Sequence, residues 1–180
     1  MKRKLPVGIQ DFAKIREGGY CYIDKTARIY ELATGAAGPV FLSRPRRFGK
    51  SLLCSTLGAV FECRRDLFGP AGGQPPLAID SLGWEWKKYP LIHIDLNPGN
   101  YTLGVPVLNS QLNITLELHE KKYGLAQGAG GDPAGRFRQL VSSVTEKAGE
   151  RAAVIIDEYD KPLLSTIDAP ETHAEIRDAL

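Results

Sequence analysis

The sequence predicts an α/β fold with a mainly parallel sheet and helices in the flanking layers. Short apolar segments alternate with stretches in which apolar residues recur at helical spacing. A Gly-Lys-Ser triplet follows one predicted strand and opens a helix, and another predicted strand ends in two acidic residues. Polar groups at the carboxyl ends of strands are typical of open α/β sheets. These three observations favour a three-layer α/β architecture over an all-α or all-β one.

The composition is that of a globular protein with nearly balanced charge. The chain has 180 residues, with 23 Lys and Arg and 21 Asp and Glu, which gives a net charge of +2. This length suffices for one sizeable core, so a single domain over residues 1–180 is expected. The balance argues against a nucleic-acid coat or a membrane-surface protein, because both carry a charge excess.

Cysteine usage and the N-terminal sequence predict a cytoplasmic protein. Cys21, Cys54 and Cys63 are odd in number and lack CxxC spacing, which favours a reducing compartment over a disulfide framework or a zinc site. The basic N-terminus lacks the continuous apolar stretch of a signal peptide. No segment approaches the roughly 20 apolar residues of a membrane span, so no membrane partner is expected.

Two strands and two helices are expected in the first part of the chain. A short strand over residues 20–23 leads into a helix over 26–33, which Gly35 and a following Gly-Pro pair end. A compact buried strand over 40–42 precedes a second helix with apolar residues at helical spacing. Those apolar residues are Leu53, Leu57, Val60 and Phe61.

The second part is expected to alternate strand, helix, helix and strand. An exposed irregular connection over residues 68–90, rich in Gly and Pro, comes first. A core strand over 91–96 follows, then helices over 107–123 and 133–148. An apolar strand over 152–156 completes the predicted elements.

Residues 43–55, SRPRRFGKSLLCS, match most of the phosphate-loop pattern G-x-x-x-x-G-K-[ST]. Gly49 would let the backbone approach a phosphate at the helix N-terminus, where free N–H groups and the helix dipole favour an anion. Lys50 would neutralise the β- and γ-phosphates, and Ser51 would place its hydroxyl on Mg²⁺. The structural alternative for this segment alone is an ordinary glycine at a helix start beside a lysine.

The first position of the pattern holds Arg44 in place of glycine. A residue with a Cβ does not easily adopt left-handed backbone angles, and Pro45 favours an extended Arg44, so Arg44 is expected to end the strand. Arg46 and Arg47 either add positive charge against a triphosphate or face water, and for each of them the two interpretations carry equal weight.

Asp157 and Glu158 follow the apolar strand Val154–Ile156. An acid at this point suits a Mg²⁺ ligand, and the next acid suits a base that orients the attacking water. A strand running into a polar turn is the alternative interpretation, equally good for this motif alone. The two motifs together, in this order on these elements, favour a nucleotide site.

Three blocks of the sequence carry a family resemblance over Leu5–Leu164. They read LPVGIQDFAKIREGGYCYIDKTARIYEL, RPRRFGKSLL and IDEYDKPLL. The chain resembles the AAA-ATPase-like proteins of bacteria, in which a P-loop ATPase domain typically precedes a PD-(D/E)xK nuclease-like domain. Arginine at the first loop position is usual in that family.

The resemblance implies an ATP site with Mg²⁺. It divides the chain into a nucleotide-proximal segment, residues 1–38, and a core from phosphate loop to acidic strand, residues 39–164. Glu158 and Lys50 are then the catalytic residues, and Ser51 and Asp157 hold the metal. The nucleotide-contacting residues are Arg46, Arg47, Phe48, Gly49, Lys50, Ser51 and Leu52.

The resemblance also bears on an upstream block and on the length of the protein. The Tyr22–Thr26 block matches a family stretch close to the nucleotide base, although a helix cap formed by Asp24 or Thr26 is favoured. The family's sheet places a sensor strand between the loop strand and the acidic strand, so the chain is expected to be the front part of a longer ATPase. Self-association and a following nuclease-like domain are the expected partners.

Two other functions stay open at this point. A catalytically incomplete nucleotide-binding or regulatory module would keep the fold without turnover. A nucleic-acid patch would use Arg44, Arg46 and Arg47 together with residues 2–4, but the balanced charge disfavours it.

The remaining polar and aromatic candidates are interpreted as structural. His93, on a buried strand, and His119, on a helix, have no partner at ligand spacing. Asp95 is expected to cap the turn after its strand. Trp84 and Trp86 are expected to cover a core edge rather than to bind a base.

Overall fold

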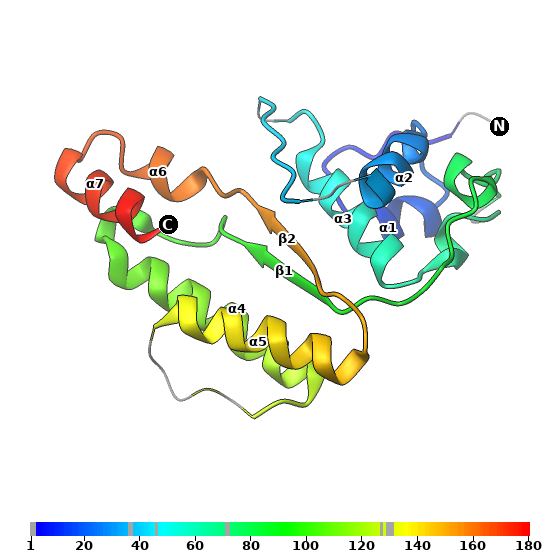
Figure 1. Cartoon of the computed structure of the whole chain (residues 1–180). Helices are drawn as coiled ribbons and strands as arrows, with labels where there is room; N and C mark the ends of the chain where they lie inside the picture. Colours follow the sequence, from blue (N-terminus) through cyan, green and yellow to red (C-terminus); the bar gives the residue numbers. More distant parts are fainter. Residues whose placement is uncertain (1–2, 36–37, 46, 71–72, 127, 129–131) are drawn as a thin grey trace. The chain divides into compact units, whose positions relative to one another are not determined.

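The computed structural model describes residues 3–35, 38–45, 47–70, 73–126, 128 and 132–180. The chain divides into two compact units, Met1–Tyr89 and Pro90–Leu180 (Figure 1).

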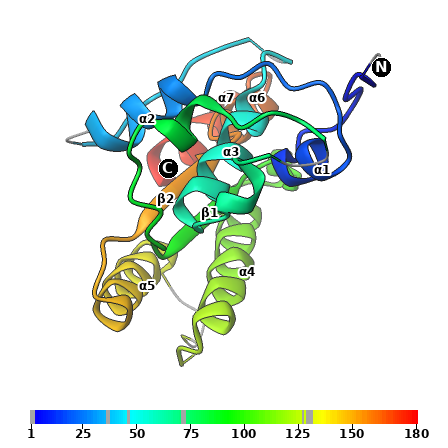
Figure 2. The ribbon, with the colours of Figure 1, turned by 90° about the vertical axis from the view of Figure 1, so that its right-hand side faces the viewer.

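The N-terminal unit is made of helices joined by irregular segments (Figure 2). Its core is rich in aromatic rings: Phe12 lies 4.8 Å from Phe68 and 5.2 Å from Tyr22, measured between ring centroids. Helix α1 packs on α3, and a 3-10 turn, η2, packs on α2. The elements are α1 (Phe12–Glu17), α2 (Thr26–Gly35), α3 (Lys50–Phe61), η1 (Arg65–Leu67) and η2 (Ala78–Ser81).

Arg16 lies at the centre of this unit and is fully buried. Its guanidinium donates to the carbonyl oxygens of Leu67, at 2.7 Å, and Gly69, at 2.7 Å. It also donates to the Pro75 carbonyl at 3.1 Å and to the Gln74 side-chain oxygen at 3.0 Å. Burial lowers the pKa of Arg16. One arginine thus satisfies the carbonyl groups of an irregular segment that has no sheet to receive them.

Two strands expected in this unit are not formed, so those predictions are wrong. Residues 20–23 and 40–42 pair with no strand in the described part of the chain. Val40 and Phe41 are exposed, although a buried strand was expected there. A strand needs a neighbour for its backbone N–H and C=O groups, whereas here the Tyr20 and Cys21 N–H groups bond to the Ile15 and Lys4 carbonyls. The predicted helices are confirmed as α2 and α3.

The 68–90 segment is irregular, as expected, but it is tied to the core. Trp84 and Trp86 are half-buried and pack against the N-terminal core cluster, which confirms their predicted structural role. The Phe68 and Trp86 rings lie 5.1 Å apart. Aromatic burial therefore orders a connection that has little regular secondary structure.

The C-terminal unit is built on a parallel pair of strands, β1 (Leu91–Asp95) and β2 (Ala153–Asp157). Leu91 aligns with Ala153, and Asp95 aligns with Asp157. Helices α4 and α5 lie along this pair in Figure 1. The other elements are η3 (Tyr101–Leu103), α4 (Val105–Tyr123), α5 (Pro133–Ala148), α6 (Lys161–Ser165) and α7 (Pro170–Ala179).

One face of the sheet packs on the helices. Ile92 and Ile94 contribute to a buried cluster with residues of α4, α5 and α7, namely Leu108, Leu116, Leu140, Val144 and Ile176. His93 alternates with those isoleucines, so its side chain points to the opposite face and is exposed. The strand is buried through its isoleucines, as predicted, whereas the His93 side chain lies outside that cluster.

Side chains of α4 bind the backbone of β1. The Tyr123 hydroxyl accepts from the Leu91 N–H at 2.7 Å and donates to the Leu91 carbonyl at 2.9 Å. Nε2 of His119 lies 3.1 Å from the His93 nitrogen and 2.9 Å from its oxygen. His119 therefore has the structural role that was predicted for it.

The α/β class and the parallel pairing are confirmed, with helix α5 at the predicted bounds. The sheet has two strands in the part of the chain that the structure describes, so the wider sheet of a P-loop architecture is not seen there.

Candidate functional site

Residues Arg47–Gly49 form a tight turn immediately before α3. Arg47 and Gly49 both have left-handed backbone angles, with φ of 67° and 78°. Gly49 is the N-cap of α3, and Lys50 is its first helical residue. Left-handed angles are unfavourable for a residue with a Cβ, so Arg47 holds strain of the kind found at functional loops.

The N-terminus of α3 leaves backbone donors open. Among the residues that the structure describes, no side-chain cap is recorded at this end, whereas Asp11 caps α1 by accepting from the Lys14 N–H at 2.9 Å. The Gly49 carbonyl already accepts from Leu53 at 3.0 Å, so the helix is regular from its first turn. No described atom lies within 4 Å of the position that a Cβ on Gly49 would occupy. An oxyanion can therefore approach the N–H groups at this end of the helix.

The side chains of the turn differ in exposure. Arg44, Arg47 and Phe48 are exposed, and Lys50 and Ser51 are half-buried. Leu52 packs against the core, so only its backbone N–H faces the turn. Arg46 lies outside the described residues. The ammonium of Lys50 and the hydroxyl of Ser51 suit a phosphate and a hard cation.

The acidic residues lie where they were predicted, at the carboxyl end of β2. Asp157 is the last residue of the strand and is 7% exposed, and its Oδ1 accepts from the Glu158 N–H at 2.9 Å. Glu158 has a left-handed φ of 54°. Its carbonyl accepts from the Lys161 N–H at 2.9 Å, which closes a turn into α6. A half-buried carboxylate on a strained backbone thus follows a buried one directly.

Asp95 lies beside Asp157 because the two residues are register partners on parallel strands. Its Oδ1 accepts from the Asn97 N–H at 2.8 Å, which confirms the predicted turn-capping role. Within the described residues, no group of three or more His, Cys, Asp or Glu side chains is placed to hold a metal ion.

The Tyr22–Thr26 block has a structural role in the N-terminal unit. Asp24 Oδ1 accepts from the Thr26 N–H at 2.8 Å and from the Thr26 hydroxyl at 2.7 Å, and its Oδ2 accepts from Ala78 at 2.8 Å. Thr26 Oγ1 in turn accepts from Ile79 at 3.1 Å. The favoured cap is thus confirmed, and it also ties α2 to η2.

A buried ion pair in the C-terminal unit was not predicted. Arg136 donates to both carboxylate oxygens of Glu120, at 2.9 and 2.7 Å, and to the Asn113 side chain at 3.0 Å. This hydrogen bonding, more than any other factor, lowers the pKa of Glu120. The sequence did contain a signal that Glu120 is buried, because Glu120 continues the four-residue spacing of Leu108, Leu112 and Leu116 on α4.

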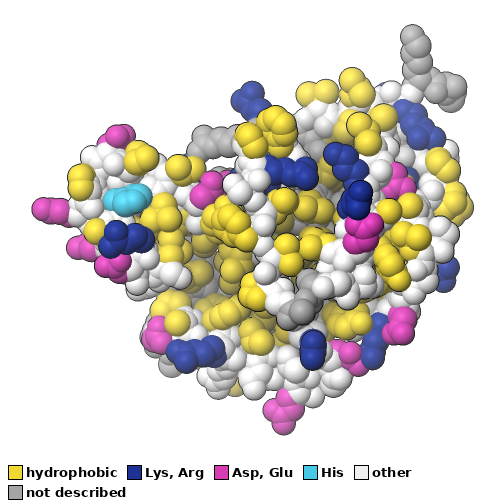
Figure 3. Space-filling model, turned by 45° about the horizontal axis from the view of Figure 1, so that its top comes forward, with side chains coloured by type: hydrophobic (Ala, Val, Ile, Leu, Met, Phe, Trp, Pro, Cys, Tyr) yellow, Lys and Arg dark blue, Asp and Glu magenta, His cyan; other side chains and the backbone are white. Residues whose placement is uncertain are grey.

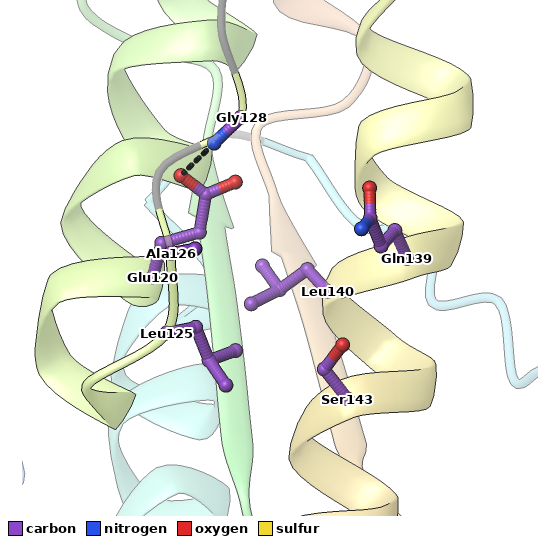
Figure 4. Close-up of a pocket in the computed structure, with 7 residues that line it drawn as sticks. All are labelled: Glu120, Leu125, Ala126, Gly128, Gln139, Leu140 and Ser143. Atoms are coloured by element: carbon purple, nitrogen blue, oxygen red, sulfur yellow. Dashed lines mark hydrogen bonds between the residues drawn. The ribbon is translucent and has the colours of Figure 1, made fainter.

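Glu120 also borders a pocket of about 180 Å³ between α4 and α5 (Figure 4). Its carboxylate accepts from the Gly128 N–H at 3.3 Å. Leu125, Leu140 and Ser143 contribute to the wall. None of the predicted site residues lines this pocket.

The phosphate turn and the acidic strand end belong to different units. Gly49, Lys50 and Ser51 lie in the N-terminal unit, and Asp157 and Glu158 lie in the C-terminal unit. Each half has the local geometry described above.

Comparison with known proteins addresses the chain as a whole. The profile of the predicted AAA-ATPase family matches residues 6–180. The chain belongs to this predicted AAA-ATPase family. A member of that family is an ATP-binding module, in agreement with the open N-terminus of α3.

One curated relative is similar to nearly the whole of this predicted AAA-ATPase chain. It is an uncharacterized protein from the vnfD 5′ region of Azotobacter chroococcum mcd 1, 38% identical over 181 residues. The alignment covers 99% of the chain and 33% of the relative, so the chain spans about a third of the relative's length. No solved structure matches the chain. Among the described helices, none has the length and apolar character needed to cross a bilayer.

Proposed function

We propose that this chain supplies the nucleotide-binding part of an ATPase that hydrolyses ATP with Mg²⁺. The observation that carries the proposal is the strained Arg47–Gly49 turn, which opens directly onto the uncapped N-terminus of α3 at Lys50. Membership of the predicted AAA-ATPase family supports ATP as the anion bound there.

Each residue of the turn would have a separate task. The α3 N–H groups and the Lys50 ammonium bind the β- and γ-phosphates. Arg47 adds positive charge at the edge of the turn, and Arg46 and Phe48 complete the contact segment. Ser51 and Asp157 would each offer an oxygen ligand to Mg²⁺, which would supply positive charge against the phosphates.

Glu158 would act on the attacking water. It orients the water and accepts a proton as the water oxygen bonds to the γ-phosphorus. The bond from that phosphorus to the β–γ bridging oxygen breaks, so the products are ADP and inorganic phosphate. The left-handed backbone at Glu158 supports this role, because strain of this kind is retained where the side chain must be aimed.

The longer relative suggests where the rest of such an ATPase would lie. Because the relative is about three times as long, we propose that further chain or a second copy completes turnover. A nuclease-like domain following the ATPase, and a cytoplasmic location, belong to the same proposal.

Calorimetric titration of MgATP, followed by phosphate release, tests the proposal. Lys50→Ala is expected to weaken MgATP binding by about tenfold to a hundredfold, as the loss of a charged hydrogen bond does. Lys14→Ala is the matched control, because Lys14 is exposed on α1. Equal binding by both variants would overturn the proposed loop.

The acidic strand end is tested by turnover. Glu158→Gln is expected to retain MgATP binding and to lower phosphate release by about a hundredfold or more. Glu146→Gln, on the exposed side of α5, is its control. Because further chain or a second copy is proposed to complete turnover, both variants are made in the full-length protein, and MgATP binding without turnover there would instead support the incomplete nucleotide-binding module.

A further inference from the structure

The two units carry opposite net charge. Residues 1–89 hold 15 Lys and Arg against 8 Asp and Glu, a net charge of +7. Residues 90–180 hold 8 Lys and Arg against 13 Asp and Glu, a net charge of −5. The balanced total of the chain therefore conceals a strongly basic unit, and charge asymmetry of this kind favours a polyanionic partner.

Most acidic groups of the N-terminal unit are already engaged. Four of them, Glu17, Glu31, Asp66 and Asp80, form ion pairs with Arg28, Arg64 and Arg65. Asp11 and Asp24 accept backbone N–H groups at helix starts. The engaged acids leave a set of cations without a carboxylate partner in the described part of the chain. The exposed members of that set are Arg3, Lys4, Lys14, Lys25, Arg44, Arg47 and Lys88.

Aromatic rings accompany these cations. Phe41 is 72% exposed and Phe48 is 64% exposed, and the two flank Arg44 and Arg47 in the sequence. On the N-terminal unit, Figure 3 shows Lys and Arg side chains beside exposed hydrophobic ones. A phosphate backbone is attracted by unpaired cations, and unpaired bases stack on exposed aromatic rings, whereas the bases of a duplex are already stacked.

We propose that the N-terminal unit binds single-stranded nucleic acid. Arg3, Lys4 and Arg44 contact phosphates, and Phe41 stacks on a base. The binding needs no nucleotide and no Mg²⁺, so it stands or fails independently of the proposed ATPase.

The test is fluorescence anisotropy with the full 180-residue chain and a labelled 20-nucleotide single strand, in EDTA and over a range of KCl concentrations. The triple variant Arg3→Gln, Lys4→Gln, Arg44→Gln is expected to bind at least tenfold more weakly. The slope of log affinity against log salt concentration should be smaller in magnitude by about 2, since each of the three lost phosphate contacts contributes about 0.7 to the slope.

The control triple variant is Arg28→Gln, Arg64→Gln, Arg65→Gln. It removes the same charge, but from arginines held in ion pairs, so its salt slope should match that of the unmodified chain. Phe41→Ala is expected to lose about tenfold in affinity with no change in slope, because stacking releases no counterions. Thermal melts of all variants verify that each is folded.

Several outcomes would overturn the inference. These are no binding by the unmodified chain, equal losses in the two triple variants, or equal affinity for a duplex of the same sequence. Binding to vesicles of anionic lipid without binding to the oligonucleotide would also overturn it, in favour of a membrane surface.

Discussion

The two units reach order by different means. In the C-terminal unit, a parallel strand pair and two long helices share a core of aliphatic side chains. In the N-terminal unit, three helices and two 3-10 turns are joined by irregular segments around aromatic rings and a buried arginine. Backbone N–H and C=O groups are satisfied mainly by strand and helix pairing in the C-terminal unit. In the N-terminal unit, side chains such as Arg16 also have to satisfy them.

Each unit also contains a buried arginine with a different partner. Arg16 donates to three carbonyl groups and one amide oxygen, all uncharged. Arg136 donates to both oxygens of the Glu120 carboxylate. The first arginine holds an irregular segment in place, and the second joins two regular helices.

The largest expected loss of stability follows from replacing Arg16 in the N-terminal unit. Arg16→Met should lower the free energy of unfolding by about 4 kcal/mol, because it leaves the buried Leu67 carbonyl and Gln74 side-chain oxygen without their donor and also removes the part-buried bonds to Gly69 and Pro75. Urea denaturation, with hydrogen exchange to locate the loss, measures this. Arg28→Met, at an exposed i,i+3 pair, should change the free energy of unfolding far less. Similar losses from the two variants would contradict the role assigned to Arg16.

The matching change in the C-terminal unit is Arg136→Met, with an expected loss of about 3 kcal/mol, because it leaves the Glu120 carboxylate buried without its partner. The pKa of Glu120 is below its usual value in the folded state. The contribution of the pair is therefore complete above the usual glutamate pKa, and it is lost as the pH falls through the lowered value.

The free energy of unfolding, measured from pH 7 to pH 3, tests this predicted loss of stability on acidification. The unmodified chain should lose more stability on acidification than Glu120→Gln, which has no carboxylate to protonate. Glu117→Gln, at an exposed pair with Lys121, serves as the control and should follow the unmodified chain. Parallel pH curves for the unmodified chain and Glu120→Gln would refute the assignment.

A smaller loss of stability is expected when the Asp24 hydrogen bonds that join α2 to η2 are removed. Hydrogen bonds from Thr26 and Ala78 outweigh the effect of burial and hold the pKa of Asp24 below its usual value. Asp24→Ala should cost about 1–2 kcal/mol, as the loss of a helix cap does. Denaturant midpoints measure it, and Glu31→Ala, exposed on α2, should change the midpoint far less.

The smallest effects compare the left-handed residues of the two units. Gly49→Ala should destabilise the chain by about 1 kcal/mol, because a Cβ is unfavourable at a φ of 78°. Glu158→Gly should stabilise it by up to about 1 kcal/mol, because it releases the strain at a φ of 54°. Thermal unfolding of the two variants provides the measurement. Stability changes of the same sign in the two variants would show that one of the two residues does not have the left-handed backbone assigned to it.

Periodicity predicted the C-terminal unit well. The bounds of α5 were obtained to the residue, and those of α4 to within its first turn, because apolar side chains recur on one face of each helix. Asp157 and Glu158 were located at the end of β2 from the order of apolar and acidic residues alone. Val40, Phe41 and Leu42 have the same apolar character as β2, yet they form no strand, since strand formation depends on a partner that local sequence does not specify.

The sequence by itself predicted helices α2, α3, α4 and α5, the positions of β1 and β2, and the Gly-Lys-Ser and Asp-Glu motifs, because each depends on local spacing. Only the tertiary structure decided that Arg16 would be buried among carbonyls and that Asp24 would join α2 to η2. Only the tertiary structure separated a basic unit from an acidic one. Those features depend on contacts between residues distant in the chain, and neither periodicity nor overall composition carries that information.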